Sequence, residues 1–276
     1  MHESFLVLRN FRYLKMMAIL VAAAIVAYVI HQPFNQPNGG TWLGYTLGGI
    51  AISLIVWLAW FGIRKRRYGV GKLSLQDWLS AHVYLGVSLI IIATLHTGFQ
   101  FGLNVHMLAY VLMLLVIASG LFGIYTYVQI PVKMTLNRDG ETQDGMFSLI
   151  AELDDACSAA AITLDDDINH AVRRAVEETR IGGGIFRQLA GTEPNCPTAV
   201  ALKDIQSRVT ELHGGEAETG RRLVSLLARK NELLARTRRD VRLKAWLDLW
   251  LYIHIPLTFA LLAALLAHVV SVFFYW

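Results

Sequence analysis

Five long apolar runs constrain this chain more than any other feature of its sequence. Each run is close to, or longer than, the roughly 20 residues that a helix needs to cross the hydrocarbon core of a bilayer. Only 17% of the 276 residues are charged, which is less than a soluble domain of this size carries. The sequence therefore predicts an all-α protein with five transmembrane helices, over 16–30, 43–63, 78–101, 105–130 and 246–276.

A polar segment separates the fourth apolar run from the fifth. Its apolar spacing predicts helices over 146–162, 164–181 and 198–212, and a long basic helix that starts near residue 216 and can continue into the fifth run. The glycines at 182–184 interrupt this pattern and predict a loop. We therefore expect three parts: transmembrane helices one to four in 1–131, a helical insert in 132–245, and the last transmembrane helix in 246–276.

Basic residues mark one side of the membrane. They flank the predicted helices at the N-terminus, in the loop after the second helix and in the insert, whereas 31–42 and 102–104 contain no Lys or Arg. The positive-inside rule then predicts a cytoplasmic N-terminus and insert, and a periplasmic C-terminus, in a bacterial inner membrane. We attribute the net charge of +4 to these flanks rather than to nucleic-acid binding. The first run lacks a small-residue cleavage site, so we expect a retained helix rather than a signal peptide.

Four histidines form two equally spaced pairs inside the predicted helices. His82 and His96 lie fourteen positions apart in the third helix, and His254 and His268 lie fourteen apart in the fifth. At about 100° and 1.5 Å per residue, the two members of a pair share one helix face and stand about 21 Å apart. Both helices are odd-numbered and run in the same direction, so His82 should be level with His254 and His96 with His268.

Two facing imidazoles are the ligand set of a six-coordinate haem iron. Neutral imidazole binds well at either axial position, so we predict two b haems, an inner one held by His82 and His254 and an outer one held by His96 and His268. A zinc site would need ligands at a single depth. Histidines that only bridge helices by hydrogen bonds are the plain alternative. The cysteines form no C-x-x-C-H motif, which excludes covalent c-type haem within this chain.

Several further residues are candidates for supporting roles. Gly86 and Gly98 follow the histidines of the third helix closely and could let a macrocycle approach the backbone, although helix packing explains them nearly as well. Arg64, Arg66 and Arg67 could pair with inner propionates or simply anchor the helix at lipid headgroups. On the outer side the polar candidates are His31, Asn104 and His106, and His106 could instead serve a quinone site.

The histidine pattern resembles that of cytochrome b in quinol-oxidising complexes. It also resembles the transmembrane domain of ferric reductases and NADPH oxidases, in which the haem helices are likewise the third and fifth. The segments from Ala81 to Gly86 and from His254 to Leu257 look like those of a group of bacterial membrane cytochromes. By this resemblance the four histidines are axial ligands. The chain departs from the oxidases because no flavin or nicotinamide domain follows the last helix, and from cytochrome b in its helix number and its insert.

These features predict an electron-transfer subunit of a larger, hetero-oligomeric oxidoreductase embedded in membrane lipid. A cytoplasmic redox protein would dock on the insert, and an external c-type cytochrome or a quinone would meet the outer haem. The basic helix of the insert could be that docking face, or could simply offset the acids of the insert in a self-complementary hairpin. A quinone-reactive cytochrome b and a haem-free membrane anchor are the two alternative functions.

Overall fold

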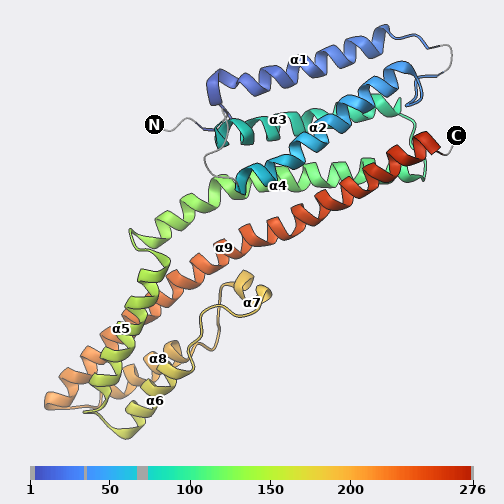
Figure 1. Cartoon of the computed structure of the whole chain (residues 1–276). Coiled ribbons are helices and arrows are strands. Elements are labelled where there is room, and N and C mark those ends of the chain that lie inside the picture. The colour runs from blue at the N-terminus through green and yellow to red at the C-terminus, as the bar shows by residue number, and fades with distance from the viewer. Residues whose placement is uncertain (1–3, 34–35, 67–73, 275–276) are drawn as a thin grey trace. The chain divides into compact units, whose positions relative to one another are not determined.

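The computed structural model describes residues 4–33, 36–66 and 74–274. All regular structure within these ranges is helical, which confirms the predicted all-α fold (Figure 1). Contacts divide the chain into two compact units. We call Met1–Gly123 together with Trp250–Trp276 the membrane unit, and Ile124–Leu249 the insert unit.

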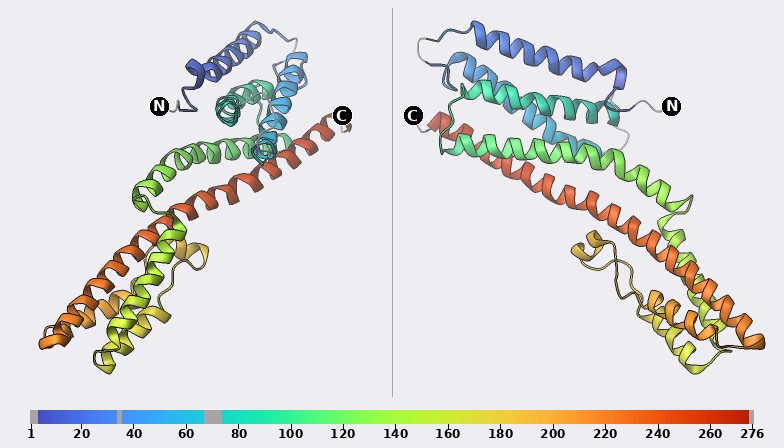
Figure 2. Two further views of the ribbon diagram at one scale, coloured as in Figure 1. Left: turned by 60° about the vertical axis from the view of Figure 1, so that its left-hand side comes forward. Right: turned by 180° about the vertical axis from the view of Figure 1, so that it is seen from behind.

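The membrane unit contains α1 (Leu8–Ile30), α2 (Trp42–Arg66) and α3 (Leu75–Thr97), with the first part of α4 (Val105–Arg138) and the last part of α9 (Gly214–Phe274). All five helices contain stretches long and apolar enough to cross a membrane, so the chain is a multi-pass membrane protein in contact with lipid. Helix α3 packs closely on α1 and α2, and the three lie side by side in both figures of the whole chain (Figures 1 and 2).

A buried carboxylate connects α1 to the start of α3. The Ser74 side chain accepts a hydrogen bond from the Asp77 amide at 3.1 Å, and the Asp77 side chain accepts one from the Ser74 amide at 3.2 Å, so the two residues form a capping box. Asp77 is fully buried and also accepts hydrogen bonds from Arg9 at 3.1 Å and from the Tyr13 hydroxyl at 3.3 Å. These contacts satisfy a charge that would otherwise be costly to bury.

The core of the membrane unit crosses its middle. Leu89 lies seven residues from both histidines of α3, and Leu261 lies seven residues from both histidines of α9. Both leucines are nearly inaccessible and belong to one apolar cluster, together with Ile92 of α3 and Met113 of α4. We call these four side chains the apolar layer. Leu89 and Leu261 mark the midpoints of the two histidine intervals, and their place in one cluster agrees with the predicted register of α3 and α9.

Two helices end at positions that differ from those predicted. Helix α3 stops at Thr97 rather than near residue 101, because Gly98 adopts a left-handed conformation (φ 60°) that caps the helix. Helix α4 continues through Pro131 to Arg138, whereas the prediction ends it at residue 130. In the insert unit Arg138 forms a two-point ion pair with the fully buried Asp240, at 2.8 and 2.7 Å, which stabilises the extension.

The insert unit is a small helical assembly. It contains α5 (Gln143–Ala161), α6 (Asp166–Glu177), α7 (Ile185–Ala190) and α8 (Pro197–Val209), with the adjoining parts of α4 and α9 (Figure 2). Its main core holds small and aliphatic side chains from α5, α6, α8 and α9, including Cys157, Ile168, Ile205 and Leu223. The short helix α7 follows directly after the glycines at 182–184, in a segment for which the sequence predicts no helix. Helix α9 runs from Gly214 to Phe274 without a break, the continuation that the sequence allows.

Replacing Lys230 with methionine should destabilise the insert unit. The Lys230 side chain is 1% exposed, pairs with Asp154 and donates to the Ala175 carbonyl at 2.8 Å. Methionine would leave a carboxylate and a carbonyl without their partner, at a cost of about 3 kcal/mol. Thermal unfolding of the purified chain, followed by circular dichroism, should show an earlier transition. Arg229→Met, at the adjacent exposed position, is the matched control, and equal unfolding of both variants would contradict the prediction.

Candidate functional site

The inner histidine level combines His82 of α3 with His254 of α9. The ring centroid of His82 lies 5.1 Å from that of Phe61 on α2. The His82 Nδ1 atom is buried and has no hydrogen-bond partner among the described residues. The Nε2 atom of His31, which belongs to neither histidine pair, is buried without a partner among these residues as well, so this feature does not by itself distinguish the inner level.

Helix α4 holds His254 in place. The Ser119 hydroxyl and His254 Nδ1 are 2.7 Å apart, and one turn earlier on α9 the Trp250 indole donates to the Ser119 carbonyl at 2.9 Å. A Cβ atom at Gly123 would lie 2.2 Å from the Trp250 ring, and one at Gly120 would lie 3.6 Å from the His254 ring. Gly123 therefore gives the Trp250 ring room to lie against α4, whereas a Cβ atom at Gly120 would make only an ordinary contact with His254.

At the outer level, α2 fixes the orientation of His96. The His96 Nδ1 atom is 2.7 Å from the Gly44 carbonyl oxygen. A carbonyl can only accept, so Nδ1 carries the hydrogen, and the lone pair of the neutral ring is at Nε2. This is the tautomer that a metal ligand needs. A Cβ atom at Gly48 would lie 2.8 Å from His96 Cε1, so only glycine at this position leaves the ring undisturbed.

His268 of α9 completes the outer level. Its ring centroid lies 6.1 Å from that of His96, with the two ring planes 85° apart. Imidazoles on opposite sides of one metal ion have centroids roughly 6 Å apart, since each metal–nitrogen bond is about 2.0–2.1 Å. Among the described residues α3 packs closely on α1 and α2 but not on α9, so side chains rather than backbone bridge the interval between the two histidine helices. This donor set fits a bis-histidine haem.

The other candidates from the sequence lie elsewhere or have local partners. A Cβ atom at Gly86 would approach only Leu58, at 3.9 Å, and Gly98 is the C-cap of α3, where a Cβ would meet the Pro37 carbonyl. Their role beside a haem stays a prediction. Asn104 caps α4 by accepting from the Met107 amide at 3.0 Å. The ring of His31 packs edge-on against Trp42.

The glycines of the second and fourth apolar runs, Gly48, Gly49, Gly120 and Gly123, predict close packing of another helix or of a flat ligand. Their sequence positions do not indicate that Gly48 lies beside His96 and Gly120 beside His254. For the basic loop, the Arg67 candidate lies outside the described residues, as does the side chain of Arg66. Their pairing with propionates stays a prediction, as does that of Arg64.

Three of the nine basic residues of α9 within the insert unit form ion pairs with acids. Arg236 lies 3.0 Å from Glu232 and 3.6 Å from Asp139, Arg238 lies 2.6 Å from Glu193, and Lys230 pairs with Asp154. These pairs agree with the self-complementary interpretation for part of the helix. The other six form no ion pair among the described residues, so the docking face stays a prediction: Arg221, Arg222, Arg229, Arg239, Arg242 and Lys244.

Cys157 and Cys196 are both free and buried. Burial raises the pKa of the Cys196 thiol, but hydrogen bonds with the Ala199 backbone and with Arg238 outweigh burial, so the pKa lies below its ordinary value. The lowered pKa reflects a thiol held between fixed donors and has no connection to the histidine levels.

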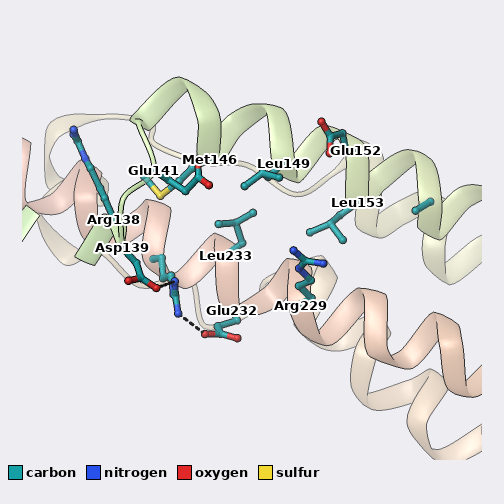
Figure 3. A pocket seen from close by; sticks show the side chains of 12 residues that line it. Arg138, Asp139, Glu141, Met146, Leu149, Glu152, Leu153, Arg229, Glu232 and Leu233 are labelled. Carbon is teal, nitrogen blue, oxygen red and sulfur yellow. Dashed lines mark hydrogen bonds and ion pairs between the residues drawn. The ribbon is translucent and has the colours of Figure 1, made fainter. Parts of the chain in front are cut away.

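A cleft of about 480 Å³ opens in the insert unit between α5 and α9 (Figure 3). Leu149, Leu153 and Leu233 lie between the two helices, and Glu152 of α5 and Arg229 of α9 also line the cleft. Acids and arginines alternate around its rim, and this mixture of charges selects no class of ligand. The cleft therefore adds no candidate site to the histidines of the membrane unit.

Comparisons with protein-family models, with characterised proteins and with solved structures find no match to this chain.

Proposed function

We propose that this protein transfers electrons across a membrane through two bis-histidine b haems, as the membrane subunit of an oxidoreductase complex. Haem iron bound between the paired imidazoles would supply a one-electron redox centre at each level. The observation that carries the proposal is the pairing itself. The His96 and His268 rings of α3 and α9 meet at the outer level, and His82 and His254 stand fourteen residues away along the same two helices, with the apolar layer in the interval.

The chain's own residues would prepare two of the four ligands for iron. Gly44 accepts the hydrogen bond from His96 Nδ1, and Ser119 occupies the Nδ1 side of His254, so in both rings Nε2 is the nitrogen left for a metal. The apolar surroundings would exclude water from the iron and from the space between the levels. These are the conditions under which iron changes oxidation state without binding an external ligand.

The proposed setting is a bacterial inner membrane with the N-terminus and the insert in the cytoplasm. His82 and His254 then form the level nearer the cytoplasm, within reach of a cytoplasmic redox protein. His96 and His268 form the level nearer the periplasm, where an external c-type cytochrome would exchange electrons. A negative cytoplasm favours outward electron flow by about 2.3 kcal/mol per 100 mV.

The decisive experiment is a haem count on the purified full-length chain. We expect two non-covalent b haems per chain by pyridine haemochrome assay, and a reduced-minus-oxidised spectrum with the α band of six-coordinate haem b. A chain that binds no haem when produced with ample haem would overturn the proposal and would favour the haem-free anchor. The quinone-reactive alternative gains no specific support, because His106 contacts His268 instead of standing free.

A further inference from the structure

A fifth histidine, His106, lies at the outer level. It occupies the first turn of α4, whose start is capped by Asn104, and its side chain is exposed. Its ring centroid lies 4.3 Å from that of His268, with the planes 89° apart, and the Nδ1 atoms of the two rings form a hydrogen bond. The ring of His268 therefore has His96 on one side and His106 on another.

The hydrogen bond between two Nδ1 atoms contains one hydrogen, which belongs to one ring or the other. If His106 carries it, a neutral His268 has its hydrogen on Nε2 and cannot bind a metal there. If His268 carries it, the Nε2 lone pair of His268 is free for iron. Only the second arrangement gives His268 the same tautomer that the Gly44 carbonyl imposes on His96.

We propose that His106 is a positioning residue for the outer haem, which accepts the hydrogen bond from His268 Nδ1 and thereby keeps His268 Nε2 available as an axial ligand. This inference rests on the proposed function. Each histidine of the outer level then has a hydrogen-bond partner at its Nδ1 atom. The partner of His96 is the Gly44 carbonyl, and the partner of His268 is His106. A partner that hydrogen-bonds to the ring nitrogen facing away from a metal fixes the orientation of the ring and raises the basicity of the nitrogen that binds the metal.

A more basic ligand stabilises the oxidised iron, which carries the higher positive charge. Replacing His106 with leucine should therefore destabilise the oxidised form of the outer haem. We expect the equilibrium constant between the oxidised and reduced forms to shift about tenfold toward the reduced form. For a one-electron couple this is a rise in potential of about 59 mV. His106→Gln keeps an oxygen that can accept from His268 Nδ1, so it should recover most of the wild-type potential.

The test is a redox titration of the purified full-length chain, monitored in the α band, for wild type, His106→Leu and His106→Gln. The inner haem, far from His106, is the control within each molecule. A rise confined to the outer haem in the leucine variant, reversed in the glutamine variant, supports the inference. Unchanged potentials, equal shifts of both haems, or a glutamine variant that behaves like leucine would overturn it. A wild-type chain without haem would refute the proposed function itself, so the two failures are distinguishable.

Discussion

Replacing His96 with alanine should lower the haem content from two to one per chain and stop electron transfer between the membrane faces. His96 is the α3 member of the outer pair, and its ring faces that of His268 at a centroid distance of 6.1 Å. Alanine offers no nitrogen, and the iron would lose one of its two axial bonds to the protein. Haem count and electron transfer to an acceptor trapped inside proteoliposomes are the two measurements.

His170→Ala is the control for this variant. His170 is exposed on α6 of the insert unit, so its loss should leave both the haem count and the transfer rate at wild-type values. Two haems per chain in His96→Ala would refute the assignment of the outer ligand. The redox potential of the haem that remains in His96→Ala is that of the inner haem. This value shows which of the two potentials in the titrations of the His106 variants belongs to the outer haem.

Replacing Gly48 with alanine should loosen the outer haem while leaving every proposed ligand in the sequence. The new Cβ atom would lie 2.8 Å from His96 Cε1 and 3.0 Å from Nδ1, closer than side chains tolerate. Either the ring turns and loses its hydrogen bond to Gly44, or α2 moves away. Overpacking of this kind costs about 1–3 kcal/mol, equivalent to a loss of roughly five- to 150-fold in haem affinity.

Gly49→Ala is a closely matched control for this change. Gly49 follows Gly48 in the interior of α2, and a Cβ atom there meets nothing within 4 Å. Both substitutions gain the same helix propensity, so their difference isolates the contact with His96. Transfer of haem to an excess of apomyoglobin measures the retention of each haem. Equal retention by the two variants would show that the space beside His96 has no bearing on haem binding.

The fold class was predictable because each transmembrane helix satisfies its own backbone hydrogen bonds, and length and hydropathy therefore identify it without knowledge of its neighbours. The register of α3 and α9 was predictable for a similar reason. Equal fourteen-residue spacings on two parallel helices fix which residues share a depth, and the burial of Leu89 and Leu261 in one cluster agrees with that register.

The neighbours of each histidine could not be predicted. Helix α2 is apolar on all sides, so its sequence does not indicate that Gly44 and Gly48, rather than Gly49, face His96. The partner of His268 was equally hidden, since His106 follows a loop whose path decides where the first turn of α4 lies. The extension of α4 past Pro131 depends on Asp240, which is about a hundred residues away in sequence.

The apolar layer has a consequence for the charge balance of the membrane. Leu89, Ile92, Met113 and Leu261 carry no group that can relay a proton or coordinate an ion, and they are almost inaccessible. A particle as light as an electron can tunnel past such side chains, whereas a hydrated ion or a proton needs a chain of polar partners. In the proposed function each turnover would therefore displace one uncompensated negative charge, so that the protein would act as an electrical conductor as well as a redox carrier.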